Sequence, residues 1–144
     1  MIIRRLKRSE IPEIVKLHKY SIFSIWKKVC KKYSLKEVSN YLKKNYNKEK
    51  IYVIEKNGKI IACGSILIYR RFKEAHIGMI LVNKKQQGQG YGKMIMEFLE
   101  DYAKKNKCNH ILLDVLIKNP AVRFYKHFNY KEFKLLMRKD LVKI

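Results

Sequence analysis

The chain is poor in the residues that interrupt or cross-link a fold, with six glycines, two prolines and three cysteines in 144 residues. Because 47% of the residues are hydrophobic, a disordered or low-complexity chain is excluded. The odd number of cysteines, without C-x-x-C spacing, argues against a disulfide framework or a zinc knuckle. No apolar run approaches the roughly 18 residues that span a bilayer, and no signal peptide is recognisable. We expect a soluble, cytoplasmic protein with no membrane partner, forming a single domain over residues 1–144.

Acidic residues are also scarce, since 12 of them face 34 basic residues and leave a formal net charge of +22. One hypothesis is therefore a basic binding module for nucleic acid or another polyanion, without catalysis. The 27 lysines far outnumber the seven arginines and are spread along the whole chain, and no recognised nucleic-acid-binding motif is present. These features argue against nucleic acid as the partner. The positive field should still attract a polyanionic cofactor.

The apolar periodicity predicts an α/β fold of the α+β kind, with a central mixed, mostly antiparallel sheet flanked by helices. Asn57-Gly58 suits a type I′ turn between two strands. Only the strands at 75–82 and 111–116 need to pair in parallel, because a helix connects them. The expected strands are 2–6, 51–55, 59–69, 75–82, 111–116 and 131–138. The expected helices run from an N-cap at Ser9 to Cys30, from a capping box at Ser34, after Gly92, and from Asn119-Pro120.

A glycine-rich turn, Gln87-Gly88-Gln89-Gly90-Tyr91-Gly92, separates the strand at 75–82 from the helix that follows it. Glycines at alternate positions allow successive N–H groups to converge on one anion, and the helix directs its positive end to the same place. A P-loop is excluded because Met94 stands where Ser or Thr is required. A dinucleotide-binding fingerprint is disfavoured because Lys93 occupies the position of its third glycine. A tight connection that binds nothing stays open for the turn taken alone.

Two segments together resemble the GNAT superfamily of acetyl-CoA-dependent N-acetyltransferases. Residues 87–92 fit the superfamily's Q/R-x-x-G-x-G/A signature and follow the strand residues Ile80-Leu81-Val82. Residues 121–130 resemble its A-x-x-F-Y-x-x-x-G-F segment, with Asn129 in place of the usual glycine. Asparagine is among the few residues that tolerate a left-handed backbone, so this departure is mild. The order of elements agrees over essentially the whole chain, and the resemblance implies the GNAT fold.

The resemblance also implies where acetyl-CoA binds. The Val82 backbone would pair with the pantetheine arm, and a bulge in the same strand would turn an amide near Ile80 toward the thioester carbonyl. Asn119 and Phe124 are further candidates for coenzyme contact, although an N-cap role explains Asn119 equally well. The pyrophosphate would be held by Gln87 and by the amides of Gly88, Gln89, Gly90, Tyr91, Gly92 and Lys93.

Acetyl transfer to an amine requires an acid for the departing thiolate and a base for the ammonium. Tyr125 matches the tyrosine that protonates the thiolate in the superfamily; its alternative role is packing on the helix face. His76 is the candidate base, with Glu74 or a relaying water as alternatives. Cys63 and Cys108 have no neighbouring base in the sequence, and no histidine spacing indicates a metal. We expect direct attack by a primary amine, small-molecule or peptide, in a ternary complex, and a homodimer by analogy with the superfamily.

Overall fold

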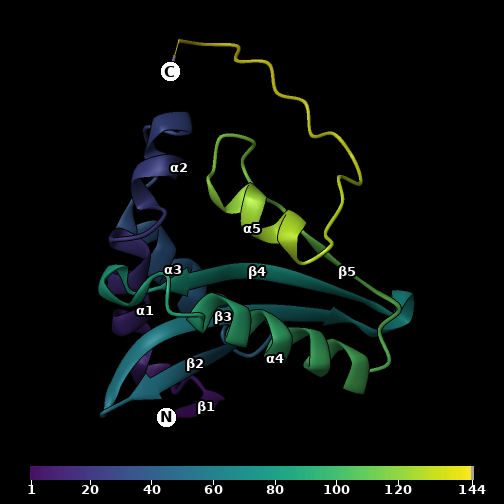
Figure 1. The fold of residues 1–144 in the computed structure, drawn as a ribbon. Helices are drawn as coiled ribbons and strands as arrows, with labels where there is room; N and C mark the ends of the chain where they lie inside the picture. Colours follow the sequence, from purple (N-terminus) through teal and green to yellow (C-terminus); the bar gives the residue numbers. More distant parts are fainter. Residues whose placement is uncertain (144) are drawn as a thin grey trace.

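The computed structural model describes residues 1–143 and contains a five-stranded sheet in the order β1-β2-β3-β4-β5 (Figure 1). The strands are β1 (Ile2–Arg5), β2 (Lys50–Lys56), β3 (Lys59–Tyr69), β4 (Glu74–Val82) and β5 (His110–Leu113). The α-helices are α1 (Ile11–Lys19), α2 (Phe23–Val29), α3 (Leu35–Asn45), α4 (Tyr91–Lys105) and α5 (Ala121–His127). Three short 3₁₀ turns are η1 (Arg8–Glu10), η2 (Arg70–Phe72) and η3 (Lys84–Gln86). None of the helices in this part of the chain has the length and apolar content that a bilayer crossing needs.

The pairing of the strands follows the sequence prediction closely. The first four strands pair antiparallel in chain order, and β4 pairs in parallel with β5. In the β2–β3 hairpin, Asn57 has φ 53° and Gly58 has φ 74°. Positive φ at both central positions is what a type I′ turn requires. The mixed, mostly antiparallel sheet and its single parallel pair are therefore confirmed.

Helices cover both faces of the sheet, and each face has its own apolar cluster. Helices α1 and α3 pack on one face, against a cluster that includes Val53, Cys63 and Leu81. Helix α4 packs on the other face against Ile54, Ala62 and Ile66. Because side chains alternate along a strand, neighbouring residues of β2, β3 and β4 belong to opposite clusters.

Helix α4 lies unusually close to β3 at Gly64. A Cβ built on Gly64 would be 2.3 Å from Cγ2 of Ile95 and 2.9 Å from Cδ1 of Leu99. Both of these side chains are fully buried. The absence of a side chain at position 64 therefore fixes how closely the helix approaches the sheet.

The single helix expected from Ser9 to Cys30 is wrong in its start and its continuity. Glu10, not Ser9, is the N-cap of α1, and the chain turns between Lys19 and Phe23 before α2 begins. The apolar stripe of α1 is buried, whereas no residue of α2 is. Because α2 does not pack on the sheet, it does not continue the buried apolar stripe of α1, and the chain bends between the two helices. The cap at Ser34 is confirmed, because its hydroxyl accepts a hydrogen bond from the N–H of Glu37 at 3.2 Å.

The strand expected at 131–138 is also wrong. Residues 131–143 contain neither helix nor strand, and the segment runs away from the sheet (Figure 1, yellow). Strand β5 likewise ends at Leu113, earlier than the expected residue 116. A β-type pattern forms a strand only where a sheet edge pairs with it, and in this chain the segment has not paired. Its apolar side chains remain 75–91% exposed: Phe133, Leu135, Leu136, Met137, Leu141 and Val142.

Candidate active site

Strands β4 and β5 separate part-way along β4. Their parallel ladder ends at the pair Ile77–Leu113, while β4 continues to Val82. At the point of separation Gly78 forms a bulge, because Ile66 of β3 pairs with Ile77 and Ser65 pairs with Met79. The bulge expected in this strand is thus present, two residues before Ile80. Residues 78–82 consequently have β3 on one side and no strand on the other, and we call this opening the β4–β5 split.

The backbone groups of Ile80 and Val82 face the split. The N–H of Asn83 donates to the carbonyl of Ile61 in β3 at 2.7 Å. In an antiparallel ladder, successive residues direct their N–H and C=O groups alternately toward and away from the partner strand. Residues 80 and 82 therefore point their polar groups away from β3, along the edge where β4 has no strand partner. An extended ligand could pair with this edge as an added strand.

Two side chains close the far end of this edge. The Val82 carbonyl accepts a hydrogen bond from Nε2 of Gln87 at 3.3 Å and one from Oγ of Ser21 at 3.4 Å. From the sequence, Gln87 was expected beside the pyrophosphate, and that role stays a prediction. Ser21, in the turn between α1 and α2, was not expected at this edge, because no local pattern indicates that this turn reaches β4.

The glycine turn lies directly beyond the split. Gly88 has φ 81° and Gly90 has φ 88°, and a Cβ at either position would have no atom within 4 Å. Glycine at these positions therefore allows the positive φ of the backbone, and the space beside each glycine is open. Tyr91 begins α4, with Gly90 as an N-cap that makes no side-chain hydrogen bond. The first N–H groups of the helix are left free for an anion, and Gln89 lies between the two glycines.

The charges around the start of α4 favour an anion as well. The first turn of α4 has no acidic residue, although acidic side chains usually stabilise that position. Lys93 is in this turn instead, with its side chain 66% exposed. The amine of Lys56 lies 3.1 Å from the hydroxyl of Tyr91 at the same end of the helix.

Helix α5 closes over the turn through Phe124. A Cβ on Gly92 would lie 3.4 Å from Cζ of Phe124 and 3.8 Å from Cγ2 of Val82, so both side chains lie close to Gly92. Asn119 directly precedes Pro120, which is the N-cap of α5, and its Oδ1 accepts from the N–H of Ala121 at 2.9 Å. The bond gives Asn119 a local role at the start of the helix, although it does not occupy the N-cap position itself. The left-handed backbone expected at Asn129 is present, with φ 67°.

Tyr125 packs against the α4-side cluster between Phe124 and Tyr130. Burial raises the pKa of its hydroxyl above the usual value of 10.0. The side chain therefore stays protonated at neutral pH, as a proton donor must. Within residues 1–143 its hydroxyl makes no hydrogen bond to protein, whereas the hydroxyl of Tyr130 donates to Glu100 at 3.0 Å.

His76 lies on the sheet face opposite to Tyr125, two residues before the bulge. Its Nε2 is 2.5 Å from Glu74, whose other oxygen is 2.8 Å from Nε2 of His110. Hydrogen bonds from His110 and then His76 lower the pKa of Glu74. Glu74 therefore contacts both histidines, and the choice of His76, Glu74 or water as the base stays a prediction.

Comparison with known proteins identifies the family. The model of the acetyltransferase (GNAT) family matches residues 20–130, which include the split, the glycine turn and α5. The chain belongs to the GNAT acetyltransferase family. The family uses acetyl-CoA as its cosubstrate, so the chain carries an acetyl-CoA-dependent acetyltransferase domain. The comparisons give no support to the alternative of a basic binding module.

Relatives of this GNAT domain agree in fold and in part in sequence. The chain is 35% identical over 77 residues to glucosamine 6-phosphate N-acetyltransferase of Arabidopsis thaliana, a match that covers 50% of each protein. The tetramutant of the BH1408 protein from Bacillus halodurans has a TM-score of 0.80 at 21% identity, covering 98% of this chain and 100% of that one. A putative acetyl transferase from Pyrococcus furiosus has a TM-score of 0.77 at 25% identity, covering 97% and 99%.

Two of the three thiols of the GNAT domain, Cys63 and Cys108, do not suit an acyl-enzyme mechanism. Cys63 is fully buried, and burial raises its pKa to about 12. Burial also raises the pKa of Cys108. Neither side chain is a thiolate at neutral pH, and the thiolate is the nucleophilic form. Over residues 1–143 no group of three or more His, Cys, Asp and Glu side chains is arranged to hold a metal ion.

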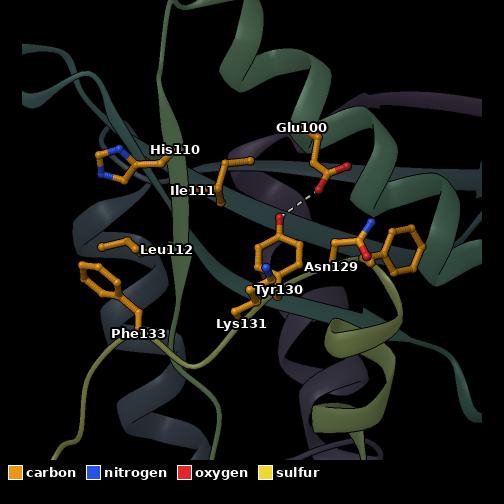
Figure 2. A pocket seen from close by; sticks show the side chains of 9 residues that line it. Glu100, His110, Ile111, Leu112, Asn129, Tyr130, Lys131 and Phe133 are labelled. Carbon is orange, nitrogen blue, oxygen red and sulfur yellow. Dashed lines mark hydrogen bonds between the residues drawn. The ribbon is translucent and has the colours of Figure 1, made fainter.

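A pocket of about 440 Å³ lies apart from the split, between β5, α4 and the chain after α5. Figure 2 shows His110, Ile111 and Leu112 of β5 along one wall, with Phe133 beside Leu112. Tyr130 reaches across it to Glu100. None of the predicted coenzyme-binding or catalytic residues lines this pocket. The pocket is therefore separate from the site residues predicted from the sequence.

Proposed function

We propose that residues 1–144 act as one domain that transfers the acetyl group of acetyl-CoA to a primary amine, by direct attack within a ternary complex. The last residue, Ile144, lies outside the described residues. The β4–β5 split carries this proposal, because it presents an unpaired strand edge that leads straight into the glycine turn. An extended arm ending in a pyrophosphate fits such an edge and such a turn. The match to glucosamine 6-phosphate N-acetyltransferase of Arabidopsis thaliana spans about half of that protein's length, and its reaction supports the proposal.

The coenzyme would be held mainly by backbone groups. The amides of Gly88, Gln89, Gly90, Tyr91, Gly92 and Lys93 would bind the pyrophosphate, with Gln87 beside them. The arm would run along the edge from Val82 toward Ile80, taking the place of Ser21 and Gln87 at the Val82 carbonyl. The amide of Ile80 would then face the thioester carbonyl, whose oxygen gains negative charge as the amine attacks. Phe124 would pack against the bound arm from α5.

The reaction forms one bond and breaks one. The amine nitrogen attacks the thioester carbon, a C–N bond forms and the C–S bond breaks. The ammonium loses one proton to His76 or to water before the attack. The thiolate then takes a proton from Tyr125, and the second proton that the nitrogen loses as the amide forms restores the Tyr125 hydroxyl through water. Because burial raises the pKa of the Tyr125 hydroxyl, this group is protonated at neutral pH and is available as the donor.

Coenzyme binding can be tested with two matched glycine variants. Gly90 and Gly58 both have positive φ and open space at the Cβ position, so an alanine at either costs about 1–2 kcal/mol of backbone strain. Only Gly90→Ala should also weaken acetyl-CoA binding, by about tenfold or more, because it disturbs amides that bind phosphate. Calorimetric titration measures both variants. Equal affinity for acetyl-CoA in the two variants would remove the turn from the binding site.

The acceptor can be identified by measuring thiol release with a panel of amines. Glucosamine 6-phosphate belongs in the panel because relatives are named for it, and its phosphate suits a chain of net charge +22. Glucosamine, butylamine and a short peptide test whether a phosphate, a sugar or a backbone is needed. If wild-type protein binds acetyl-CoA but releases thiol with none of these amines, acetyl transfer to a primary amine is the wrong reaction.

We also propose that two copies associate through the C-terminal segment, defined as residues 131–143. In each copy β5 lacks a strand neighbour on its outer side, and the pocket lies against it. The segment has the apolar side chains and the extended form to add to this edge in the second copy. Contiguous exposed apolar surface of this kind is rare on monomers. The cytoplasmic location expected from the sequence stays a prediction.

A further inference from the structure

Glu49 is a buried carboxylate without a cation. The residue directly precedes β2 and is 5% exposed. Its Oε1 accepts from the hydroxyl of Tyr41 at 2.7 Å, and its Oε2 accepts from Oγ of Ser65 at 2.7 Å. Although the chain has 34 basic residues, none of those in residues 1–143 forms an ion pair with Glu49. Burying a charge without a countercharge is costly, so this arrangement calls for an explanation.

The other carboxylates at the sheet show what a structural role would look like. Glu10 and Glu55 share the guanidinium of Arg4. Glu74 contacts two histidines. Glu49 instead has two neutral hydroxyl donors, and burial raises the pKa of the Tyr41 hydroxyl to about 12, so that hydroxyl remains a donor. The site is therefore polar, negative and short of one positive charge.

Glu49 lies against the start of the β4–β5 split. A Cβ on Gly78 would be 2.5 Å from Oε2 of Glu49 and 2.6 Å from Oγ of Ser65. Gly78 is the bulge residue, is exposed, and comes directly after Ile77, the last residue of β4 paired with β5. From Val82 back to Gly78 the edge is about 13 Å long, at about 3.3 Å per residue. The carboxylate thus lies beside the end of the edge that is farther from the glycine turn.

We propose that Glu49 and Ser65, with Tyr41 behind them, form the binding site for the ammonium group of the acceptor. This inference rests on the proposed function and deepens it, because it assigns the acceptor to the class of cationic primary amines. Each carboxylate oxygen that accepts from a hydroxyl can accept a further hydrogen bond, and the three N–H groups of an ammonium match such acceptors. Glu49 and Tyr125 pack on opposite faces of the sheet, so the amine and the acid would reach the split from opposite sides.

The variant Glu49→Gln tests the charge while keeping the size of the side chain. We expect the KM for butylamine and glucosamine to rise about 10- to 100-fold, as loss of a charge-assisted hydrogen bond does. The KM for p-anisidine, an amine that is neutral at the assay pH, and the Kd for acetyl-CoA should change less than twofold. Glu55→Gln is the matched control, because it removes a carboxylate beside Arg4 at the far edge and should leave every KM unchanged.

Other results would overturn the proposal. Equal changes in KM for charged and neutral amines, or no change in either, would mean that Glu49 only links α3 to the sheet. If Glu49→Gln does not fold, Gly78→Ala is the substitute. Its Cβ would displace the carboxylate, so the KM for charged amines should rise while the KM for the neutral amine stays the same.

A second measurement keeps this inference separate from the proposed function. If wild-type protein turns over none of the amines, the ammonium site can still be tested. NMR spectra recorded during a titration with butylammonium chloride report binding at that site without any reaction. Shifts at the amides of Ser65 and Gly78 that are absent with butanol would support the site. Equal responses to butylammonium and butanol would overturn it, whatever the reaction of the domain proves to be.

Discussion

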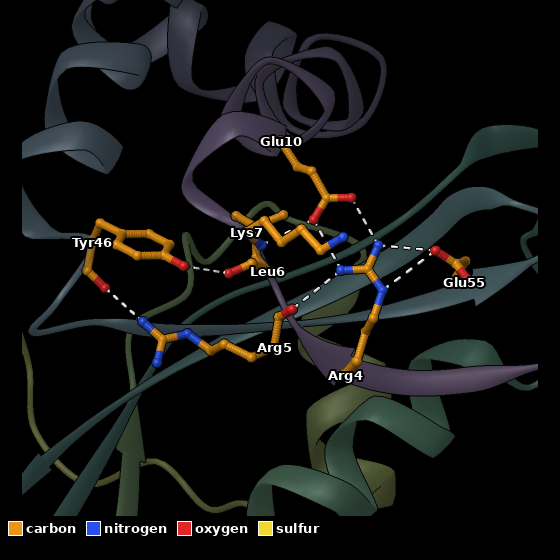
Figure 3. A network of polar contacts seen from close by, with 7 residues as sticks. All are labelled: Arg4, Arg5, Leu6, Lys7, Glu10, Tyr46 and Glu55. Atoms are coloured by element: carbon orange, nitrogen blue, oxygen red, sulfur yellow. Dashed lines mark hydrogen bonds and ion pairs between the residues drawn. The ribbon is translucent and has the colours of Figure 1, made fainter.

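The two edges of the sheet are built in opposite ways. At the β1 edge, Arg4 joins Glu10 of η1 to Glu55 of β2, at 2.7 and 2.9 Å (Figure 3). Arg5 donates to the carbonyl of Tyr46, whose hydroxyl donates in turn to the carbonyl of Leu6. The charged side chains at this edge are therefore paired within the chain, and we call it the closed edge. At the β5 edge, Glu74 joins His110 of β5 to His76 of β4, but the strand is bordered by the split on one side and the pocket on the other.

The difference indicates where the molecule binds others. A closed edge satisfies its polar groups within the chain and resists association. An open edge leaves backbone groups for a ligand or a second copy. We therefore expect changes at the β5 side to alter catalysis and association, and changes at the β1 side to alter stability alone. Four predictions test this contrast.

The largest effect is expected at the open side, from Tyr125→Phe. Loss of the hydroxyl removes the proposed proton donor for the thiolate, and general acids contribute about 10²- to 10⁴-fold, so turnover should fall by about 100-fold or more. The Kd for acetyl-CoA should stay within twofold. Steady-state kinetics and calorimetry measure the two quantities. Tyr130→Phe is the control, because it removes a buried hydroxyl near the pocket and should leave turnover unaltered. Unchanged turnover in Tyr125→Phe would reduce Tyr125 to a packing residue.

The next effect concerns the C-terminal segment. Replacing Leu135 and Leu136 together by lysine should weaken self-association by about 100-fold, because burial of a leucine contributes about 1.5–3 kcal/mol. Sedimentation equilibrium measures the change. Ile2→Lys alters an exposed apolar side chain at the closed edge and should leave association as it was. A wild-type protein that is monomeric at high concentration would contradict the proposal directly.

A smaller effect is expected at the β1 edge, from Arg4→Gln. The substitution leaves Glu10 and Glu55 without their shared cation and should lower the free energy of unfolding by about 1–2 kcal/mol, since the side chains are partly exposed. Urea denaturation checks the value, and the Kd for acetyl-CoA should not move. Weaker acetyl-CoA binding in this variant would contradict the expectation that changes at the β1 edge alter stability alone.

The smallest effect is a pH dependence at the same edge. Hydrogen bonds from Arg4 lower the pKa of Glu10 from 4.5 to about 2. Between these values the unfolded chain binds more protons than the folded one, so stability increases with pH. The contribution of Glu10 is complete above pH 4.5 and is lost as the pH falls toward 2. Unfolding measured across this range should show a shallower slope in Arg4→Gln than in wild type, and equal slopes would exclude the linkage.

Local patterns in the sequence predicted most of the elements and the glycine turn. The hairpin at Asn57-Gly58 and the free helix start at Gly90 follow from backbone preferences of single residues. The contact of Ser21 with Val82 and the burial of Glu49 beside Gly78 were not predictable in this way. Each depends on residues that lie far apart in the chain, and only the folded sheet brings them together. The strand expected at residues 131–138 was wrong for a related reason. A strand-like pattern in the sequence does not indicate which other strand it would pair with.

The close contact of α4 with Gly64 has a consequence for the glycine turn. Because α4 begins at this turn and touches the sheet without an intervening side chain, the helix start and β3 are mechanically linked. A methyl group added at Gly64 would push the middle of the helix outward and tilt its first turn, although position 64 is remote from any bound anion. If the turn binds phosphate as proposed, a substitution at Gly64 would alter that binding from the opposite side of the helix, without contacting the phosphate.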